Sequence, residues 1–354
     1  MKYVLIGLAI FFVIATVLPL IRHDHWWIRI FDFPRGQIAL GGVVILAVYL
    51  LVWDTSSLFE DVLFVVLLSA VVFQGIQMFP YTPFYPNEVV AADEAPPDSC
   101  ISLLVANVLM SNRESGNLLD LVEEYQPDVI LTVETDAWWE KQLRALETEY
   151  PHTLKNPLDN TYGMLLHSRL ELIEPEIRYL VKDSIPSMHA GIRLPSGIAV
   201  QFHGIHPEPP FPKYADDTTE RDAELLLVGK EVEEEDRPTI VAGDLNDVAW
   251  SYTTSLFQKI SGLLDPRKGR GMYNTFHAEN GLMRWPLDHV FHSDHFKLVR
   301  LERGPAWGSD HFPVFIQLCL DPSAEYEQEE PEADRNDEEE ADKKIEKAAT
   351  EQDS

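Results

Sequence analysis

Three long apolar runs fill the first part of the chain. Residues 4–21, 36–53 and 62–79 are each 18 residues long and carry no charged side chain. A helix of roughly 20 apolar residues crosses the hydrocarbon core of a bilayer, and a cleaved signal peptide would explain only the first run. The pattern therefore predicts three transmembrane helices within residues 1–80, and a buried helical hairpin is the alternative.

The segment 22–35 between the first two runs is typical of a membrane interface. It contains three arginines and the aromatic residues Trp26, Trp27, Phe31 and Phe33. Side chains of both kinds concentrate where a bilayer meets water. Three spans place this segment and the chain after residue 80 on the same face. The arginines favour the cytoplasmic face, although Lys2 before the first span favours the opposite orientation. We expect a multi-pass protein of the cell membrane, with a lean towards a cytoplasmic C-terminal domain.

The remaining chain divides by composition into a linker, a domain and a tail. Residues 81–98 lie in a proline-rich stretch, which predicts a semi-extended linker. Residues 321–354 contain 15 acidic and 4 basic side chains and almost no large apolar ones. They cannot bury enough surface to offset the entropy of ordering, so we expect a disordered acidic tail. Residues 99–320 are long enough for one large domain with its own core.

Within residues 99–320, short apolar runs alternate with helical patterns. The predicted strands cover residues 101–105, 129–133, 162–166, 192–194, 198–203, 239–242, 290–292 and 312–318. The predicted helices cover residues 118–125, 138–149, 223–232 and 253–260. Strands dominate, with helices between some of them, and this indicates a layered α/β or α+β domain.

Several predicted strands end or begin at a polar side chain that could bind a metal ion or a phosphate. These residues are Asn107, Glu134, His206, Asp244, Asn246, Asp288, Asp310 and His311. A site on one rim of a layered sheet requires polar residues at strand ends. Taken singly, each residue also fits an ordinary turn, loop or helix cap, so only their combination indicates a function.

The formal charge of the whole chain is −30, from 28 basic and 58 acidic side chains. This balance argues against tight, non-specific binding to duplex DNA, which depends on lysine and arginine at the phosphates. It does not exclude a metal enzyme that acts on phosphate esters, because a bound cation supplies positive charge locally.

The two cysteines exclude a disulfide-rich scaffold and a cysteine-based zinc module. Cys100 lies seven residues before Asn107, and Cys319 lies eight residues after His311. If both strands reach one site, they run antiparallel, and the two cysteines lie at a similar depth on the far side. They would then be able to pair in an oxidising compartment. Two isolated buried thiols are the alternative.

In their order and spacing, the strand-end residues resemble the endonuclease/exonuclease/phosphatase superfamily. The matching segments are 106–108, Glu134, 163–169, 206–207, 243–247, 288–291 and 309–313. The combination of Gly243-Asp244-Leu245-Asn246 with Ser309-Asp310-His311 is a specific signature, and the match covers essentially all of residues 100–320. The N-terminal part is similar to that of a membrane-associated bacterial branch.

The resemblance implies a four-layered α/β sandwich of two packed, mainly antiparallel sheets with helices outside. It also implies hydrolysis of a phosphate ester by water, with Mg²⁺ as the usual metal and Mn²⁺ as the alternative. It assigns metal binding to Glu134, Asn107 and Asp310, and catalytic roles to Asp244, Asn246, His206, Asp288 and His311. Asp244 would align the attacking water, and Asp288 would fix the tautomer of His311. Many members have Gln before the metal Glu, whereas this chain has Val133.

We therefore expect a membrane-anchored, Mg²⁺-dependent phosphoesterase. Its partners would be the lipid bilayer and a phosphate-ester substrate, lipid-linked or nucleic acid, with no stable protein partner. A nuclease acting on DNA or RNA and a non-catalytic membrane scaffold are the alternatives. A nuclease needs a basic rim around its site, and the candidates for such a rim are Lys155, Arg178, Arg193, Arg267, Lys268 and Arg270.

Overall fold

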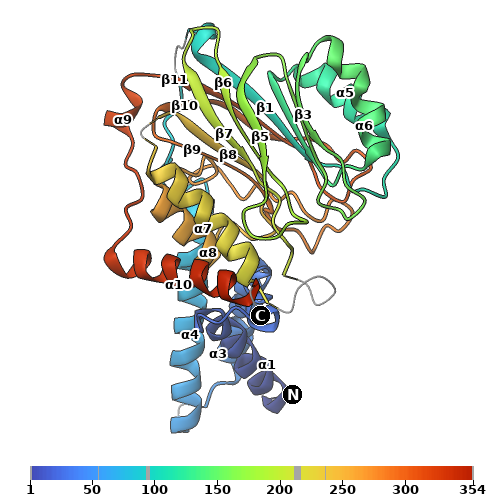
Figure 1. Cartoon of the computed structure of the whole chain (residues 1–354). Coiled ribbons are helices and arrows are strands. Elements are labelled where there is room, and N and C mark those ends of the chain that lie inside the picture. Colours follow the sequence, from blue (N-terminus) through green and yellow to red (C-terminus); the bar gives the residue numbers. More distant parts are fainter. Residues whose placement is uncertain (1, 55, 93–95, 211–216, 236, 353–354) are drawn as a thin grey trace.

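The computed structural model describes residues 2–54, 56–92, 96–210, 217–235 and 237–352. Three of its helices are long and apolar enough to cross a bilayer, namely α1 (Lys2–Val17), α3 (Arg35–Val52) and α4 (Leu58–Met78). They form a stalk below the rest of the molecule (Figure 1). No more than 28% of any of these spans is buried within the protein. Most of their apolar surface therefore faces outward, as contact with lipid requires and a buried hairpin does not.

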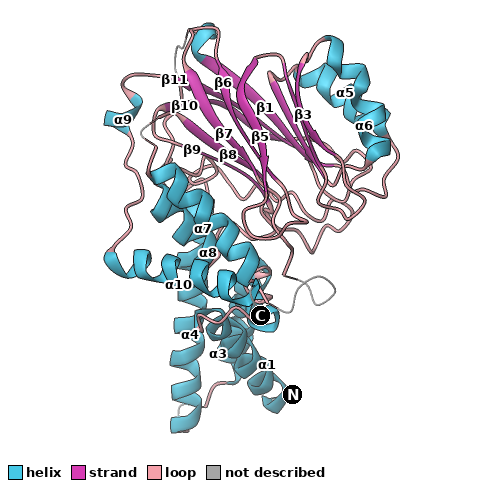
Figure 2. Ribbon diagram, in the orientation of Figure 1, coloured by secondary structure: helices cyan, strands magenta, loops and turns pink. Residues whose placement is uncertain are grey.

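Two mixed β-sheets form the body of the molecule (Figure 2). The six-stranded sheet has the order β10-β11-β1-β2-β4-β3, with β1 (Cys100–Asn107), β2 (Val129–Val133), β3 (His152–Asn156), β4 (Met164–Ser168), β10 (Phe296–Arg303) and β11 (Val314–Leu320). The five-stranded sheet has the order β5-β6-β7-β8-β9, with β5 (Glu171–Arg178), β6 (Ser187–Arg193), β7 (Ala199–Gly204), β8 (Thr239–Asp244) and β9 (Asp288–His292). Each sheet is antiparallel except for one parallel pair, β1 with β2 and β7 with β8.

The two sheets face each other across an apolar core, where Leu131 and Phe202 belong to the same buried cluster. Helices cover the outer faces (Figure 2). These are α5 (Ser115–Tyr125) and α6 (Ala137–Leu143) on the six-stranded sheet, and α7 (Thr219–Glu233) and α8 (Tyr252–Ser261) on the other. The result is a four-layered α/β sandwich, so the predicted fold class is confirmed.

Local sequence fixes the start of two of these outer helices. The carboxylate of Asp136 accepts a hydrogen bond from the backbone N–H of Trp139 at the start of α6. The hydroxyl of Ser251 does the same for Thr254 at the start of α8. Such caps satisfy backbone donors that have no partner inside the helix.

The parallel pairs determine where the ends of the central strands lie. Parallel neighbours end at the same edge of a sheet, so Asn107 at the end of β1 lies beside Val133 at the end of β2. In the other sheet, Asp244 at the end of β8 pairs with Asp288 at the start of the antiparallel β9. The strand-end residues therefore converge on one rim of the sandwich.

This rim lies against two segments next to the apolar helices. One is segment 22–35, which contains the short helix α2 (Trp26–Arg29), and the other is the segment that follows α4. Trp250 Nε1 donates to Asp32 O at 2.7 Å, and the Tyr81 hydroxyl donates to Ala249 O at 2.6 Å. Tyr81 and Trp250 also share a buried apolar cluster with Met78, the last residue of α4. The domain is thus packed directly onto the end of the stalk.

The proline-rich segment after α4 is packed, which corrects the prediction of a semi-extended linker over residues 81–98. Val89 is fully buried in the core between the sheets, and Glu88 forms an ion pair with Lys268 at 2.6 Å. Prolines favour an extended backbone but do not prevent the side chains between them from packing. Residues 93–95 of this segment lie outside the described residues.

The acidic tail is folded, so the prediction of disorder over residues 321–354 is wrong for its described part. It forms α9 (Ala324–Glu327) and α10 (Arg335–Gln352), and α10 lies across α7 and α8 (Figure 1). Lys344 of α10 pairs with Asp222 of α7 at 2.9 Å and with Asp24 of segment 22–35 at 2.6 Å. Residues 353 and 354 lie outside the described residues.

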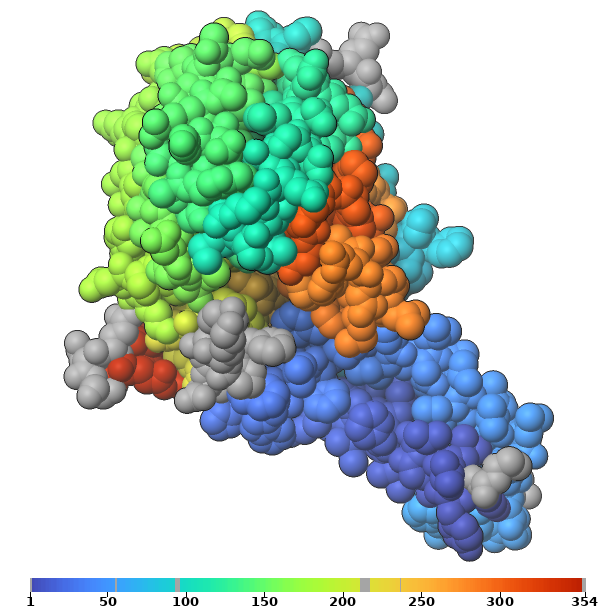
Figure 3. Space-filling view, turned by 90° about the vertical axis from the view of Figure 1, so that its right-hand side faces the viewer, coloured from blue at the N-terminus to red at the C-terminus, as the bar shows by residue number. Residues whose placement is uncertain are grey.

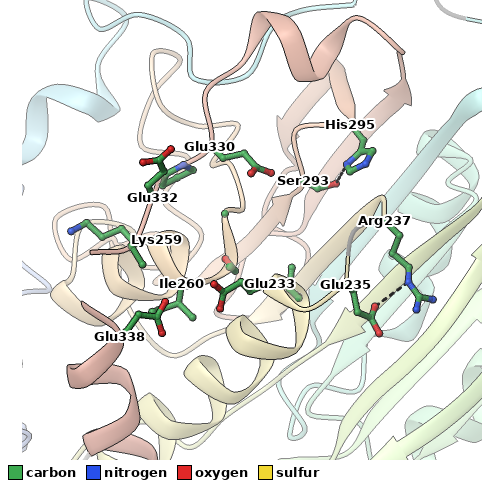
Figure 4. Close-up of a pocket in the computed structure, with 15 residues that line it drawn as sticks. Glu233, Glu235, Arg237, Lys259, Ile260, Ser293, His295, Glu330, Glu332 and Glu338 are labelled. Atoms are coloured by element: carbon green, nitrogen blue, oxygen red, sulfur yellow. Dashed lines mark hydrogen bonds and ion pairs between the residues drawn. The ribbon is translucent and has the colours of Figure 1, made fainter. Parts of the chain in front are cut away.

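The path of the tail also forms a cavity of about 490 Å³ beside α7 and α8 (Figure 4). Acidic side chains such as Glu233 and Glu338 line it, together with Lys259 and His295. None of the strand-end residues singled out in the sequence borders this cavity. The chemistry indicated by the sequence therefore belongs to the rim.

The two cysteines lie at the opposite end of the sandwich from this rim. Cys100 and Cys319 are direct partners in the antiparallel β1–β11 pair, with their Cα atoms 4.0 Å apart. They form a disulfide, so the hypothesis that they are close enough to pair is confirmed.

Candidate active site

Asn107 lies at the centre of the rim and connects the two sheets. Its amide nitrogen donates to Glu134 Oε1 and to Asp244 Oδ2, both at 2.9 Å. Its amide oxygen accepts from the backbone N–H of Leu109. Asn107 is fully buried and Asp244 is 1% exposed. The Asn107 side chain therefore sets the spacing of the Glu134 and Asp244 carboxylates, while its own oxygen is occupied by the hydrogen bond from Leu109.

Asp288 and His311 form a buried pair beside these carboxylates. His311 Nδ1 lies 2.7 Å from Asp288 Oδ2, and His311 Nε2 lies 3.6 Å from Asp244 Oδ2. Burial lowers the pKa of His311, but the charges of Asp288 and Asp244 outweigh this effect and raise it to about 10. His311 is therefore a cation at neutral pH, with one ring nitrogen held by Asp288 and the other directed at Asp244.

The remaining carboxylates are crowded and incompletely satisfied. Burial raises the pKa of Asp244, and the charge of His311 opposes this only in part. Burial also raises the pKa of Asp310, and nearby Glu134 contributes to the rise. Among the described residues, Asp310 Oδ1 and Asp288 Oδ1 are buried without a hydrogen-bond partner. Unpaired carboxylate oxygens gathered in this way are the donors that a hard divalent cation takes, so the residues present fit such a cation.

A second indication comes from geometry alone. Asp244, Asp288 and His311 each offer a ligand atom, and these atoms lie within 4.8 Å of one another. In this trio, His311 Nδ1 is already engaged by Asp288. Of the two nearby carboxylates, Asp310 has one oxygen with no partner among the described residues, and Glu134 accepts one hydrogen bond on each oxygen, from Asn107 and from the backbone N–H of Met110.

Two of the site residues have a strained backbone. Glu134 has φ 61° and Asn246 has φ 51°, in the left-handed region that residues other than glycine seldom occupy. Strain of this kind persists where the surrounding structure fixes the conformation and clusters at functional sites. At Asn246, the backbone N–H donates to Asp244 Oδ1 and the amide nitrogen donates to Pro207 O.

His206 completes the set of predicted residues on the rim. It is 3% exposed, and its Nδ1 lies 3.1 Å from the backbone oxygen of Asp244. Its ring lies beside that of Tyr162, with the centroids 5.8 Å apart. The structure therefore gathers all eight residues predicted from the sequence on one rim.

Three polar residues that the sequence reasoning missed hold this arrangement in place. The Ser309 hydroxyl donates to Asn107 O and accepts from the backbone N–H of His311. The Thr275 hydroxyl accepts from the backbone N–H of Asp288. Arg221, 2% exposed, donates to Asn246 O at 3.0 Å. Ser309 could have been found from its place in Ser309-Asp310-His311, whereas Thr275 and Arg221 carry no local signal.

The comparison with protein families covers the segments that form this rim. The model described as the endonuclease/exonuclease/phosphatase family matches residues 104–311, a stretch that begins before Asn107 and ends at His311. This chain belongs to the endonuclease/exonuclease/phosphatase family. It is accordingly a metal-dependent hydrolase that acts on ester bonds.

Solved structures share the fold of this family member. An endonuclease/exonuclease/phosphatase from Beutenbergia cavernae has a TM-score of 0.51 at 17% identity, over 63% of this chain and 72% of that one. The human Nocturnin catalytic domain with bound sulfate anion has a TM-score of 0.52 at 16% identity, over 64% and 97%. Humanized D. rerio TDP2 has a TM-score of 0.51 at 20% identity, over 62% and 99%. At these identities the likeness establishes the fold alone. No curated protein matches the sequence significantly.

Proposed function

We propose that this protein is a membrane-anchored, Mg²⁺-dependent phosphoesterase that hydrolyses a phosphodiester or phosphomonoester by attack of water. The observation that carries the proposal is the rim itself. Asn107 ties two carboxylates together there, beside a cationic His311 held by Asp288. The three apolar helices support the membrane anchor by their length and composition.

His311 and Asp244 would carry the chemistry in the protein. The positive charge of His311 would stabilise the negative charge that develops on the phosphate oxygens. Asp244, 3.6 Å from His311 Nε2, would orient the attacking water and accept its proton, while Asn246 and His206 would contact phosphate oxygens. Asp288 would keep the ring of His311 in one orientation.

Glu134 and Asp310 would hold the metal, with Asn107 keeping Glu134 in place. The amide oxygen of Asn107 accepts from Leu109, so a direct ligand role for Asn107 would require its amide to turn over. When bound, a divalent cation would polarise the phosphate and offset the negative charge of this acidic rim. Mg²⁺ needs only one or two carboxylates and keeps its remaining waters, which suits this donor set; Mn²⁺ is the alternative.

The structure gives the nuclease alternative little support, because the candidate basic rim is occupied. Five of its six members pair with carboxylates, in the pairs Lys155–Glu147, Arg178–Glu231, Arg193–Glu171, Arg267–Asp265 and Lys268–Glu88. The sixth, Arg270, donates to backbone oxygens. Few of these cations remain available for a nucleic-acid backbone. The scaffold alternative does not account for the strained, oriented site residues.

We also propose that the domain lies on the oxidising face of the membrane, which differs from the cytoplasmic lean of the arginine count. Disulfides persist in oxidising compartments, and Cys100 and Cys319 are paired. Lys2 precedes the first span, which usually dominates orientation, and keeps the N-terminus inside. A C-terminal epitope tag should then be digested by protease in intact spheroplasts. A tag protected until lysis would contradict this orientation.

The activity itself is tested with soluble chromogenic esters on the full chain in detergent. We expect Mg²⁺-dependent hydrolysis of bis(4-nitrophenyl) phosphate or 4-nitrophenyl phosphate, and the preferred ester decides between diester and monoester. His311→Ala should abolish the activity. Duplex DNA and RNA serve as competing substrates, and faster hydrolysis of either would favour the nuclease alternative. If no ester is hydrolysed by the unmutated chain, the proposal fails.

A further inference from the structure

One loop connects the catalytic rim to the start of a membrane helix. We call residues 275–285 the bridging loop. At its site end, the Phe276 ring lies beside that of His311, with the centroids 4.9 Å apart. The backbone N–H of Ala278 donates to Asp310 O, and that of Phe312 donates to Thr275 O. The first residues of the bridging loop, 275–278, thus form a wall of the site next to its catalytic histidine, and its tip lies outside this wall.

The bridging loop also contacts the apolar helices, through Trp285, which pairs with Phe276 at the base of the loop, and through Leu282 at its tip. Trp285 makes an edge-to-face contact with Phe33 of segment 22–35, at 5.8 Å between centroids. Gln37, in the first turn of α3, donates from Nε2 to Leu282 O at 2.8 Å. In Figure 3 the orange surface that includes this loop lies directly above the blue N-terminal helices. Leu282 therefore lies at the depth where α3 begins.

The tip of the bridging loop exposes two large apolar side chains, next to the exposed polar residues Glu279 and Asn280. The side chain of Leu282 is 83% exposed and that of Met283 is 45% exposed. Large apolar side chains beside the first turn of a membrane helix gain by entering the lipid rather than facing water. Entry of these two side chains into the lipid would leave the loop base in the catalytic rim.

Positive charge without an acidic partner gathers at the base of the same loop. The Arg284 and Arg303 guanidinium groups lie 4.9 Å and 4.2 Å from the Phe312 ring centroid. Burial lowers the pKa of Arg303, and the charge of Arg284 contributes, which shows that the two are neighbours. Both donate to backbone oxygens, and neither is within 4.0 Å of a carboxylate among the described residues. They can therefore attract an anion.

We propose that the substrate is a phospholipid of the bilayer in which the protein is anchored, and that its headgroup phosphate reaches the rim along the bridging loop. This inference rests on the proposed phosphoesterase activity and names its substrate class. The acyl chains stay in the membrane beside Leu282 and Met283. To reach His311, the headgroup has to leave the bilayer surface only by a distance equal to the length of the bridging loop. Water attacks phosphorus, the P–O ester bond breaks, and the leaving alcohol takes the proton.

The test uses the full chain reconstituted into phosphatidylcholine vesicles that also contain phosphatidylglycerol or phosphatidic acid, with Mg²⁺ present. Bis(4-nitrophenyl) phosphate and 4-nitrophenyl phosphate in the same preparation report the activity independently of lipid. The variant Leu282→Asp/Met283→Asp should lower lipid hydrolysis by at least about tenfold. Keeping one large apolar side chain out of the lipid weakens insertion of the loop by about that factor or more. Hydrolysis of the soluble esters should not change.

The matched control is Ile198→Asp/Val299→Asp. These two side chains are 45% and 46% exposed but lie away from the bridging loop, in the β6–β7 turn and on β10. The control should hydrolyse lipid and soluble ester as the unmutated chain does. An equal loss of lipid activity in both variants would overturn the role of the loop.

Insertion is measured separately, so that a variant that folds poorly does not decide the matter. A solvent-sensitive fluorophore on Leu282→Cys should shift to the blue in vesicles and be quenched by lipid-borne nitroxide. The same fluorophore on Ile198→Cys should do neither. Identical behaviour at the two positions would overturn the inference.

The outcomes separate the two proposals. Hydrolysis of a soluble ester without hydrolysis of any vesicle lipid would overturn the lipid substrate and leave the phosphoesterase proposal standing. Absence of both activities would overturn the phosphoesterase proposal itself. Loss of lipid activity alone in Leu282→Asp/Met283→Asp would support both.

Discussion

At the scale of single residues, the site depends on how each polar side chain is held. Asp288 accepts from His311 on one oxygen, and its backbone N–H is fixed by Thr275. The sequence identified Asp288 and His311 because both stand at strand ends in a recognisable order. It did not identify Arg221, which reaches Asn246 O from α7, because residues 25 positions apart in sequence share no local pattern.

Replacing Asp288 with Asn tests the histidine pair. The amide keeps the shape but removes a charge that raises the pKa of His311, so this pKa should fall from about 10 and the ring should lose its fixed orientation. We expect kcat to fall by about 10²–10⁴-fold on a soluble ester, the range for a positioned acid or base.

Asp294→Asn is the matched control, since Asp294 also pairs with a histidine, His295, at 3.3 Å, but in the β9–β10 turn. Its kcat should equal that of the unmutated chain. A similar kcat for Asp288→Asn would show that the pair has no catalytic role.

At the scale of elements, strands in the middle of the sheets were predictable, and of the four edge strands only β9 was predicted, from the apolar pair Val290-Phe291. The apolar runs of β1, β2, β8 and β11 are buried almost throughout. In contrast, β3, β5 and β10 were not predicted, and each is an edge strand. An edge strand has a partner on one side only and tolerates polar residues. In β5, for example, Glu171, Glu174 and Glu176 hide the pattern.

The tail helix shows the same limit. Its composition favours disorder, yet Ala341, Lys344 and Ala348 fall on one face of α10 and are buried. Two of these positions are apolar, and Lys344 reaches Asp222 and Asp24. A helix that fully buries only small side chains and a paired lysine, with Ile345 as its one large apolar contact, leaves little hydrophobic periodicity to detect.

Lys344→Ala should release α10 from the domain. Breaking a buried ion pair costs about 3–5 kcal/mol, and we expect the lower end because Arg221 still neutralises Asp222. Hydrogen exchange in residues 335–352 should rise strongly. Lys343→Ala, at an exposed neighbouring position, should leave exchange unchanged. Equal protection of α10 in both variants would show that the lysine does not hold the helix.

The same contact predicts how docking of α10 depends on pH. The Asp222 pKa is lowered in the folded state, because the charges of Lys344 and Arg221 outweigh burial. Ionised Asp222 therefore stabilises the docking of α10 at pH values above its pKa in the unfolded chain, about 4, and this stabilisation is lost as the pH falls further. Burial lowers the pKa of Lys344, but the charges of Asp222 and Asp24 outweigh it and raise this pKa. The stabilisation from charged Lys344 is therefore lost as the pH rises beyond the ordinary lysine pKa of about 10.4. Protection of α10 against exchange, measured relative to the rate of an unfolded chain at the same pH, should be greatest between these limits and lower outside them.

At the scale of the whole molecule, the domain is seated with its acidic rim towards the stalk. Trp250 and Tyr81 bond across the junction, and the disulfide closes the opposite end of β1 and β11. This arrangement explains how a chain of charge −30 could approach an anionic bilayer lipid, since the crowded acids of the rim would be neutralised by a bound cation.

Removing the metal should therefore affect stability as well as activity. A chelator should abolish hydrolysis and lower the melting temperature, because it restores repulsion among Asp244, Asp310 and Glu134. Saturating Mg²⁺ at about 100 times its Kd would stabilise the folded chain by about 2.7 kcal/mol. In Asp310→Asn the shift caused by Mg²⁺ should shrink. A melting temperature that is independent of Mg²⁺ in the unmutated chain would argue against binding at this rim.

The sequence by itself determined the features that depend on neighbouring residues. These are the three apolar runs, the buried central strands and the order of polar residues at strand ends, which indicated the family and the fold. The tertiary structure alone decided which distant segments meet. It placed α10 on α7, the bridging loop between His311 and α3, and Arg221 behind Asn246. Such contacts arise from long-range packing and paired charges, which leave no periodic trace along the chain.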